Sequence, residues 1–363
     1  MQASKFSDTL NTLRWVSAFL VVIGHLRSFI FINYAGVEQQ NLLVKLFYYI
    51  TGFGHQAVMV FFIISGYLVG GGLLMKYKEN KLDSTYLKLY FIKRFSRIYI
   101  VLIPALIMGY FLDSLGLSYF TKLYHNFYHI SSMNNDVVER LSLDVLMGNL
   151  FNLQTIFVEP LGSNGPLWSL ANEWWYYILF AFLFINNITR LIFIFIVGVL
   201  FFQNEQILVY SFIWLLGASL VLVNKKLLHQ SLSFIILFIA LLFTRKFTGV
   251  YTDFILAIAL FLFINSISFN KNNVKKIVFK FNKSMANFSY STYLFHFPFI
   301  VFVISALHNN KIDLLSMQPN INTFLYYLFV LSALYLYSYI MYLLFESKTY
   351  VLQKYLQYKL KDN

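Results

Sequence analysis

Long runs of apolar residues are the dominant pattern along this chain. A helix needs roughly 17–25 predominantly apolar residues to cross the hydrocarbon core of a bilayer. Runs of about this length predict transmembrane helices at 12–33, 56–75, 90–112, 168–186, 206–223, 250–268, 286–307 and 322–345. Two shorter runs, 190–203 and 231–244, are predicted to cross as well once their flanking residues are included.

One further apolar run, 144–157, is the most polar of the set because it contains Asn149, Asn152 and Gln154. We predict a re-entrant or interfacial segment here rather than a span. Ten spans then remain, which places both termini in the cytoplasm. The predicted fold is therefore an all-α polytopic membrane protein, a bundle of about ten transmembrane helices.

The distribution of positive charge favours this topology, because cytoplasmic loops of polytopic proteins carry an excess of Lys and Arg. The cytoplasmic side would collect Lys5, the block Lys76 to Arg97, Arg190, Lys225, Lys226, five lysines within 271–283 and four in the tail. The other side would receive only Lys45, Lys122, Arg140, Arg245, Lys246 and Lys311. The predicted boundaries are a cytoplasmic N-terminus at 1–11, a transmembrane domain at 12–345 and a basic cytoplasmic tail at 346–363.

Composition supports a bilayer environment and excludes several other classes of protein. Hydrophobic residues make up 59% of the chain and charged residues 12%, whereas globular domains have about 45–50% and 25%. The sequence has no cysteine, which excludes thiol catalysis and cysteine-ligated metals, and it has no His-Glu-x-x-His metal motif. Membrane orientation accounts for the net charge of +13, so we expect no nucleic-acid partner and no bound metal.

Arg14 and His25 are the first candidate functional residues, because polar groups at membrane depth are costly and often functional. They are eleven residues apart, which is within about 20° of a whole number of helical turns, so both side chains share one face. A snorkelling anchor is the alternative for Arg14, and a helix-packing hydrogen bond is the alternative for His25. An imidazole suits general-base catalysis on an alcohol.

The segment from Gly165 to Tyr177 provides the second group of candidates. Helical spacing puts four of its polar side chains on one face, namely Ser169, Asn172, Glu173 and Tyr176. In the ten-span topology Glu173 lies at a depth comparable to that of His25, where a carboxylate can orient the imidazole. The alternative is an aromatic belt at the outer interface, formed by Trp168, Trp174 and Trp175, although a belt does not explain Glu173.

A basic run precedes the third predicted span, and two of its arginines, Arg94 and Arg97, are spaced three apart. Guanidinium groups match phosphate geometry, so these arginines are candidates to bind the phosphates of a nucleotide-bearing donor. Positive-inside anchoring is an equally good interpretation. In the second span, the Ser65-Gly66 pair permits close approach of a backbone or a ligand.

Three polar residues near the remaining spans have weaker claims to a functional role. His296 stands two residues before Pro298, and a structural, hydrogen-bonded imidazole is the favoured interpretation. Glu346 ends the last span and is expected to pair with Lys348 or with an arginine of the 93–97 run. Asp253 lies close to the predicted outer interface and needs no special role.

Taken in order, six motifs resemble those of the acyltransferase-3 family of integral-membrane acyltransferases. They are Arg-x10-His at Arg14 and His25, Phe-Phe-x-x-Ser-Gly-Tyr at 61–67, Arg-x-x-Arg at Arg94 and Arg97, Gly-Pro-Leu-Trp-Ser-Leu-x-x-Glu-Trp at 165–174, Ser-Tyr-x-x-Tyr-Leu-x-His-x-Pro at 289–298, and Phe-Glu at Phe345 and Glu346. The resemblance extends from Leu13 to about Glu346. The chain departs from many members at Met59, where an acidic residue is common. Many members also carry an SGNH-type hydrolase domain after the membrane part, and we expect this protein to act without one.

The resemblance implies acyl transfer, most simply of acetyl, from acyl-CoA to a hydroxyl of a cell-surface or lipid-linked glycan such as O-antigen, in a bacterial inner membrane. Acetyl-CoA is then a donor substrate, and no bound cofactor is implied. Arg14 and His25 become the essential pair, with Glu173 orienting His25. Arg94, Arg97 and Ser65 are assigned to the donor, and Trp168, Asn172 and Tyr176 to the acceptor. A non-enzymatic transporter or flippase of a lipid-linked saccharide, and a transferase of succinyl or longer acyl groups, are the alternatives.

Overall fold

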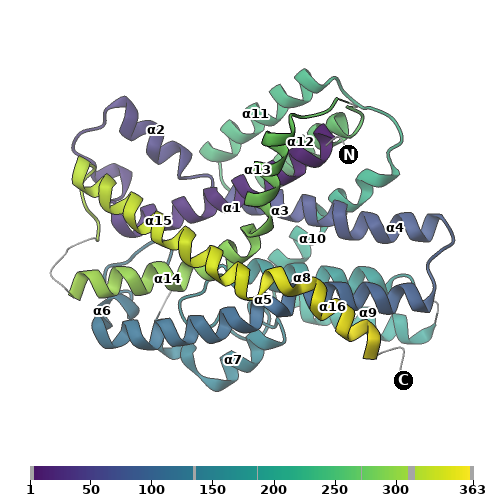
Figure 1. The fold of residues 1–363 in the computed structure, drawn as a ribbon, viewed down its shortest axis with the longest axis horizontal. Helices are drawn as coiled ribbons and strands as arrows, with labels where there is room; N and C mark the ends of the chain where they lie inside the picture. The colour runs from purple at the N-terminus through teal and green to yellow at the C-terminus, as the bar shows by residue number, and fades with distance from the viewer. Residues whose placement is uncertain (1–3, 134–135, 186, 271, 310–314, 360–363) are drawn as a thin grey trace. The chain divides into compact units, whose positions relative to one another are not determined.

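The computed structural model describes residues 4–133, 136–185, 187–270, 272–309 and 315–359. Three of the charges behind the predicted orientation, Lys271, Lys311 and Lys361, lie outside this range, as do the other residues of the predicted tail at 360–363. Apart from isolated bridges, the described residues form helices, turns and loops (Figure 1). The all-helical fold predicted from the sequence is therefore confirmed.

Sixteen α-helices follow one another along the described chain. They are α1 (Lys5–Ile30), α2 (Leu42–Ile50), α3 (Gly54–Ser65), α4 (Gly71–Lys78), α5 (Ser84–Tyr119), α6 (Thr121–Tyr124), α7 (Leu143–Leu150), α8 (Leu167–Phe182), α9 (Ile188–Phe202), α10 (Glu205–Ser219), α11 (Gln230–Lys246), α12 (Val250–Ser268), α13 (Lys276–Asn287), α14 (Ser289–Asn309), α15 (Ile321–Leu344) and α16 (Thr349–Lys359). A π-helical segment, η2 (Gly66–Gly70), joins α3 to α4.

Each of the ten predicted spans coincides with a helix or, for 56–75, with the continuous α3–η2–α4 run. Within the described residues, seven helical stretches are long and apolar enough to cross a membrane. The other three, α8, α9 and α11, have 16, 15 and 17 residues. How many helices cross, and which side each terminus faces, remain predictions.

Three helices differ from the sequence prediction: one is longer than expected and two were not predicted. Helix α5 has 36 residues and extends beyond both ends of the predicted span at 90–112. Helix α2 lies in the segment 34–55 between the first two predicted spans, and α13 lies in the basic segment around 271–283. The apolar criterion detected neither α2 nor α13, because each is shorter than a span.

The segment 144–157 contains only one short helix, the eight-residue α7, which is about 12 Å long at 1.5 Å per residue and cannot cross a bilayer. The side chains of Asn149, Asn152 and Gln154 are fully buried in the protein. The Asn149 amide donates to the carbonyls of Val145 and Glu159 at 2.8 Å. Gln154 donates to the carbonyl of Leu167, at the start of α8. These polar side chains therefore fix the loop that leads into α8.

Large apolar side chains cover the exposed faces of several helices. On α15 exposed apolar side chains recur at helical spacing, among them Ile321, Leu325, Leu328, Phe329 and Leu336. On α9, Phe195 and Phe202 are 72% and 89% exposed. A soluble protein rarely exposes contiguous apolar faces of this kind, whereas a bilayer solvates them.

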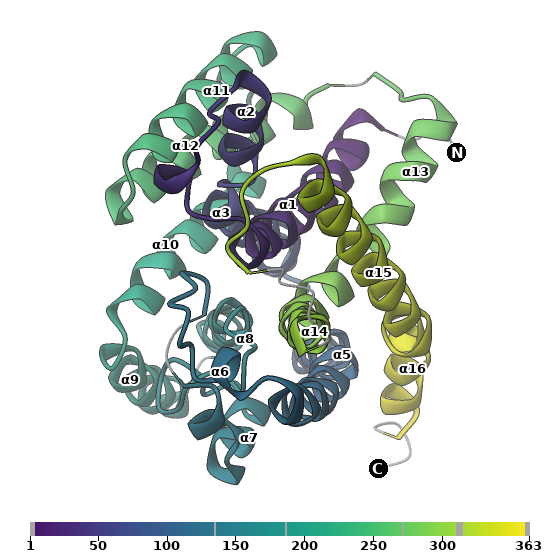
Figure 2. The same cartoon turned by 90° about the vertical axis from the view of Figure 1, so that its left-hand side faces the viewer.

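The chain divides into two compact units. The first contains Met1–Ser17, His55–Arg94 and Asn172–Asn287. Within it α11 and α12 lie side by side (Figures 1 and 2), and the segment around η2 packs very closely on α10. A Cβ atom added to Gly66 would lie 2.0 Å from the Trp214 carbonyl oxygen, and one added to Gly217 would lie 2.2 Å from that of Ile63. The expected close backbone approach at Ser65-Gly66 is therefore a helix–helix contact.

The second unit contains Ala18–Gly54, Phe95–Ala171 and Phe288–Asn363. Its helices α14 and α15 lie side by side (Figure 2). Apolar residues from α1, α14 and α15 form its core, among them Val22, Leu26, Phe29, Phe297, Ile300, Ile304, Val330 and Leu334. This core holds the second half of α1, which carries His25, against the middle of α14, which carries His296.

Candidate active site

Two histidines, His25 of α1 and His296 of α14, are hydrogen-bonded to each other in the second unit. The Nδ1 atom of His25 lies 2.8 Å from Nε2 of His296. The ring centres are 5.1 Å apart and the ring planes differ by 2°. The distance between the two nitrogens is shorter than the distance between the ring centres by about the sum of the two ring radii. Since the ring planes are also parallel, the rings lie end to end in one plane. His296 is fully buried and His25 is partly exposed.

Pro298 explains how a polar side chain is able to reach the backbone of α14 beside His296. Proline has no N–H, so the carbonyl four residues earlier, that of Leu294, lacks its usual helical donor. The side-chain amide of Asn164 donates to this carbonyl at 2.9 Å. Asn164 immediately precedes the Gly165-Pro166 pair just before α8, so the carbonyl freed by Pro298 also anchors that segment.

A second contact joins the same two motifs. The Tyr293 hydroxyl of α14 lies 2.7 Å from the Ser169 hydroxyl of α8 and donates weakly to the Pro166 carbonyl at 3.3 Å. Both side chains are buried. The motif at 289–298 is thus fixed to the first turn of the motif at 165–174, and Ser169, predicted on the face with Glu173, has a structural partner.

Glu346 is buried and forms an ion pair with Arg97, with 2.6 Å between Glu346 Oε1 and an Arg97 terminal nitrogen. The other carboxylate oxygen accepts hydrogen bonds from the backbone N–H and the hydroxyl of Ser291. Of the two kinds of partner expected for Glu346, the arginine is the one observed. The Arg97 guanidinium also lies over the Tyr290 ring, 4.9 Å from its centre.

Arg94 has different surroundings in the first unit. Its guanidinium carbon lies 5.9 Å from the centre of the Tyr90 ring and 5.8 Å from that of Tyr177. The Arg94 Nε atom is buried and has no hydrogen-bond partner among the described residues. A half-buried guanidinium beside two aromatic rings favours an anion, because cation–π contacts leave its N–H groups unsatisfied.

Glu173 and Ser65 meet at Tyr177 in the same unit. The Tyr177 hydroxyl donates to the Glu173 carboxylate and lies 3.0 Å from the Ser65 hydroxyl. The Ser65 oxygen also accepts from the Trp214 ring nitrogen at 3.1 Å. Two predicted site residues from different helices are therefore joined by a tyrosine that we did not predict.

The remaining predicted residues lie on α1 and α8. Arg14 and Trp168 are partly exposed. The Tyr176 hydroxyl donates to the Ile207 carbonyl at 2.7 Å, so a backbone group satisfies it. Asn172 is buried, and within the described chain its side-chain oxygen has no hydrogen-bond partner.

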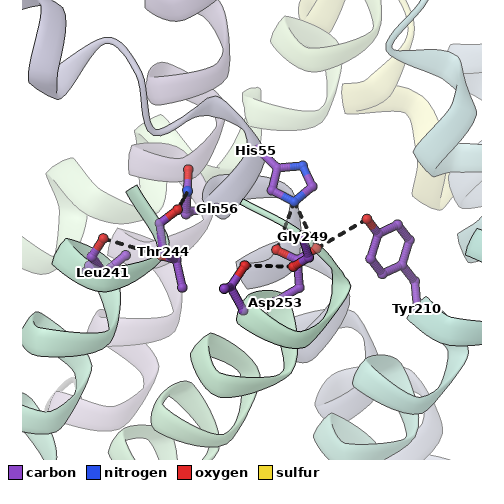
Figure 3. A network of polar contacts seen from close by, with 8 residues as sticks. His55, Gln56, Tyr210, Leu241, Thr244, Gly249 and Asp253 are labelled. Carbon is purple, nitrogen blue, oxygen red and sulfur yellow. Dashed lines mark hydrogen bonds and ion pairs between the residues drawn. The ribbon is translucent and has the colours of Figure 1, made fainter. Parts of the chain in front are cut away.

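A third polar cluster lies in the first unit (Figure 3), and nothing in the sequence drew attention to it. His55 Nε2 lies 2.8 Å and 3.0 Å from the two carboxylate oxygens of Asp253, and the Tyr210 hydroxyl donates to the same carboxylate at 3.2 Å. The Asp253 side chain is only 3% exposed. The prediction that Asp253 lies at an interface and needs no special role missed this contact, which links three helices.

Among the residues that the structure describes, no three or more histidine or acidic side chains gather to hold a metal ion. The arrangement therefore offers imidazoles, carboxylates and guanidinium groups as its reactive side chains. A base flanked by a second ring suits proton transfer, and a half-buried guanidinium suits binding of an anion.

Comparison with known proteins agrees with this chemistry. A family model described as an acyltransferase domain matches residues 8–343. The chain is also 24% identical over 323 residues to an O-acetyl transferase of the Shigella phage Sf6, an alignment that covers 83% of this chain and 87% of that protein. No solved structure matches the chain.

The long apolar helices and their exposed apolar faces define a polytopic integral membrane protein. The family match covers nearly the whole chain, so the protein belongs to the acyltransferase-3 family and is an acyltransferase. The family resemblance inferred from the six motifs is confirmed.

Proposed function

We propose that the protein transfers an acyl group, most simply acetyl, from acyl-CoA to a hydroxyl of a cell-surface or lipid-linked glycan in a bacterial inner membrane. The observation that carries this proposal is the hydrogen-bonded pairing of His25 with His296 in a chain that matches the family along nearly its whole length. The similarity to a phage protein named O-acetyl transferase supports acetyl as the group transferred.

In the proposed reaction His25 acts as the general base. Its imidazole removes the proton of the acceptor hydroxyl while the oxygen attacks the thioester carbonyl. The carbon–sulfur bond then breaks, and CoA leaves as a thiolate that takes the proton from His25. General-base assistance of this kind contributes about 10²–10⁴ in rate.

A second version makes His25 an acyl carrier. The imidazole attacks the thioester, CoA leaves, and the acyl group rests on His25 until the glycan hydroxyl attacks it. This version predicts ping-pong kinetics and a burst of CoA release without acceptor. The general-base version requires both substrates to be bound before CoA is released.

Arg94 supports the assignment of acyl-CoA as donor. A guanidinium with a buried nitrogen that lacks a hydrogen-bond partner within the described chain is well suited to a phosphate, which accepts several charge-assisted hydrogen bonds. Arg97, in contrast, already binds Glu346. Arg94 is therefore the better of the two candidates for the donor phosphates, and Arg14 is a further candidate on α1.

On the acceptor side we propose that Trp168 stacks on a sugar ring and that Asn172 hydrogen-bonds it. The buried, unbonded oxygen of Asn172 supports this role. Tyr176 has the weaker claim, because its hydroxyl binds a carbonyl of α10. Glu173 was expected to orient His25, but its carboxylate accepts a hydrogen bond from Tyr177, and the side chain hydrogen-bonded to His25 is that of His296.

Mass spectrometry of surface polysaccharide tests the proposal. Cells with the wild-type gene should carry acylated glycan, and cells with His25→Ala should lose the acyl group while the protein still inserts at normal levels. His229→Asn is the matched control, because His229 caps α11 by accepting from the Ser231 N–H, and asparagine preserves a cap.

The same experiment separates the alternatives. A transporter of lipid-linked saccharide predicts unchanged acylation but altered glycan export in the His25→Ala strain. A succinyl or longer-acyl transferase predicts a different mass increment on the same glycan. Retained acetylation in the variant would refute the role of His25.

A further inference from the structure

We propose that His296 is a positioning residue, which holds the proton of His25 on Nδ1 and leaves Nε2 of His25 as the reactive atom. The inference rests on the proposed function, because it concerns the base that this function requires. It goes beyond that function by assigning the reactive nitrogen and the residue that selects it.

The backbone of α14 determines which ring nitrogen of His296 carries the hydrogen. Its Nδ1 atom lies 2.7 Å from the backbone carbonyl oxygen of Tyr293. A carbonyl oxygen accepts hydrogen bonds and has no proton to give. The Nδ1 atom must therefore carry the hydrogen, and in the neutral ring the Nε2 atom of His296 then has the lone pair.

The tautomer of His296 determines the tautomer of His25. The lone pair on His296 Nε2 faces His25 Nδ1 at 2.8 Å, so with both rings neutral His25 must donate from Nδ1. The Nε2 atom of His25 is then the unprotonated nitrogen. No other hydrogen bond of the His25 ring is found among the described residues, which leaves this atom available to a substrate.

The geometry of the two rings supports a directed hydrogen bond rather than a packing contact. The rings are coplanar and end to end, so the Nδ1–H bond of His25 points along the in-plane lone pair of His296. Phe297 meets the His25 ring edge-on, with 5.1 Å between ring centres. These contacts therefore fix both the orientation and the tautomer of the His25 ring.

The Tyr293 carbonyl, which accepts the hydrogen bond from His296, is held in place by α14 and its neighbours. The side chain of Tyr293 binds Ser169, and the adjacent Leu294 carbonyl binds Asn164. Two side chains from the segment that opens α8 therefore anchor the turn of α14 that carries the Tyr293 carbonyl. The sequence motif at 289–298 supplies both the carbonyl and the second imidazole.

The arrangement serves either version of the reaction. As a base, His25 takes the hydroxyl proton on Nε2, and the resulting imidazolium strengthens its Nδ1–H hydrogen bond to His296. As an acyl carrier, His25 attacks the thioester with the same Nε2 lone pair. His296 plays the part that a carboxylate plays in Ser-His-Asp enzymes, without placing a negative charge inside the membrane.

Two amide variants of His296 separate positioning from simple structural support. Asparagine places its amide near the position of Nδ1, so it can keep the contact with the Tyr293 carbonyl but gives His25 no acceptor. Glutamine places its amide oxygen near the position of Nε2, so it can accept from His25. Purified variants would be compared with wild type and His25→Ala for transfer of acetyl from acetyl-CoA, per amount of folded protein.

We expect His296→Asn to lower kcat by about 10²-fold or more, with KM for acetyl-CoA unchanged, and His296→Gln to restore most of the rate. An Asn variant as active as the Gln variant, or more active, would overturn the positioning role. If wild type and His25→Ala are equally inactive, the proposed function itself fails.

Chemical modification of the wild-type protein gives a second test that does not depend on variants. Iodoacetamide alkylates the nitrogen that carries the lone pair. His25 recovered from a digest should be carboxyamidomethylated on Nε2. Predominant modification of Nδ1 would contradict the proposal even if both variants fold poorly.

Discussion

Glu346 binds Arg97 with one carboxylate oxygen and the N-terminal turn of α14 with the other. A carboxylate at a helix N-terminus satisfies unpaired N–H groups and interacts favourably with the helix dipole. The contact joins α5, α14 and the segment after α15, so its first role is to hold the helix that carries His296.

The ion pair predicts strong coupling between its partners. Glu346→Ala and Arg97→Ala should each lower stability, and the double variant should lose less than the sum, with a coupling of about 1–3 kcal/mol. The measurement is the midpoint of thermal unfolding in detergent for the four proteins of the cycle. Additive losses would show that the observed contact does not stabilise the protein.

Arg94 should affect donor binding rather than stability. We expect Arg94→Ala to raise KM for acetyl-CoA by at least about tenfold, because one charge-assisted phosphate contact contributes about 1.5–3 kcal/mol. Steady-state kinetics with acetyl-CoA and with an acetyl-pantetheine that lacks the nucleotide phosphates would check this. Equal effects on both donors would exclude phosphate as the ligand of Arg94.

The close contact between the η2 region and α10 predicts that methyl groups are not tolerated there. Gly66→Ala and Gly217→Ala should each destabilise the protein by about 1–3 kcal/mol or more, because the added Cβ meets a backbone carbonyl that has to move. Gly72→Ala is the matched control, since a Cβ added there meets no atom within 4 Å. Thermal unfolding of the three variants would be compared, and equal midpoints would contradict the observed packing.

The cluster of His55, Asp253 and Tyr210 in Figure 3 predicts unequal effects of its members. Asp253→Ala should lower stability by about 1–3 kcal/mol. The buried carboxylate binds two partners, and its removal leaves both of them without a hydrogen-bond partner in this cluster. His55→Ala should have a smaller effect, about 1 kcal/mol, since the His55 side chain is 44% exposed. A larger loss on replacing His55 would contradict this order.

Helix positions were predictable from the sequence because the bilayer imposes a length and a polarity on each span. The ends were less predictable, as α5 shows, because a helix can continue beyond the apolar run. Glu346 was expected to pair with Lys348 or with an arginine of the 93–97 run, because all of them stand at predicted helix ends on one side of the membrane, and Arg97 is the partner observed.

The pairing of His25 with His296 was not predictable in the same way, since it depends on which helices pack together. Each imidazole was visible as a polar group in an apolar run, but His296 was favoured as structural. Tyr177 was missed for a different reason. Both Tyr176 and Tyr177 lie one turn from Glu173, and helical spacing does not decide between them.

The most direct test of the central claim is acetyl transfer by the purified protein in proteoliposomes. Labelled acetyl-CoA and a glycan acceptor would be supplied, and labelled glycan measured for wild type, His25→Ala and His229→Asn. We expect transfer by wild type and by His229→Asn, and a loss of at least about 10²-fold in His25→Ala. Transfer by His25→Ala at the wild-type rate would contradict it.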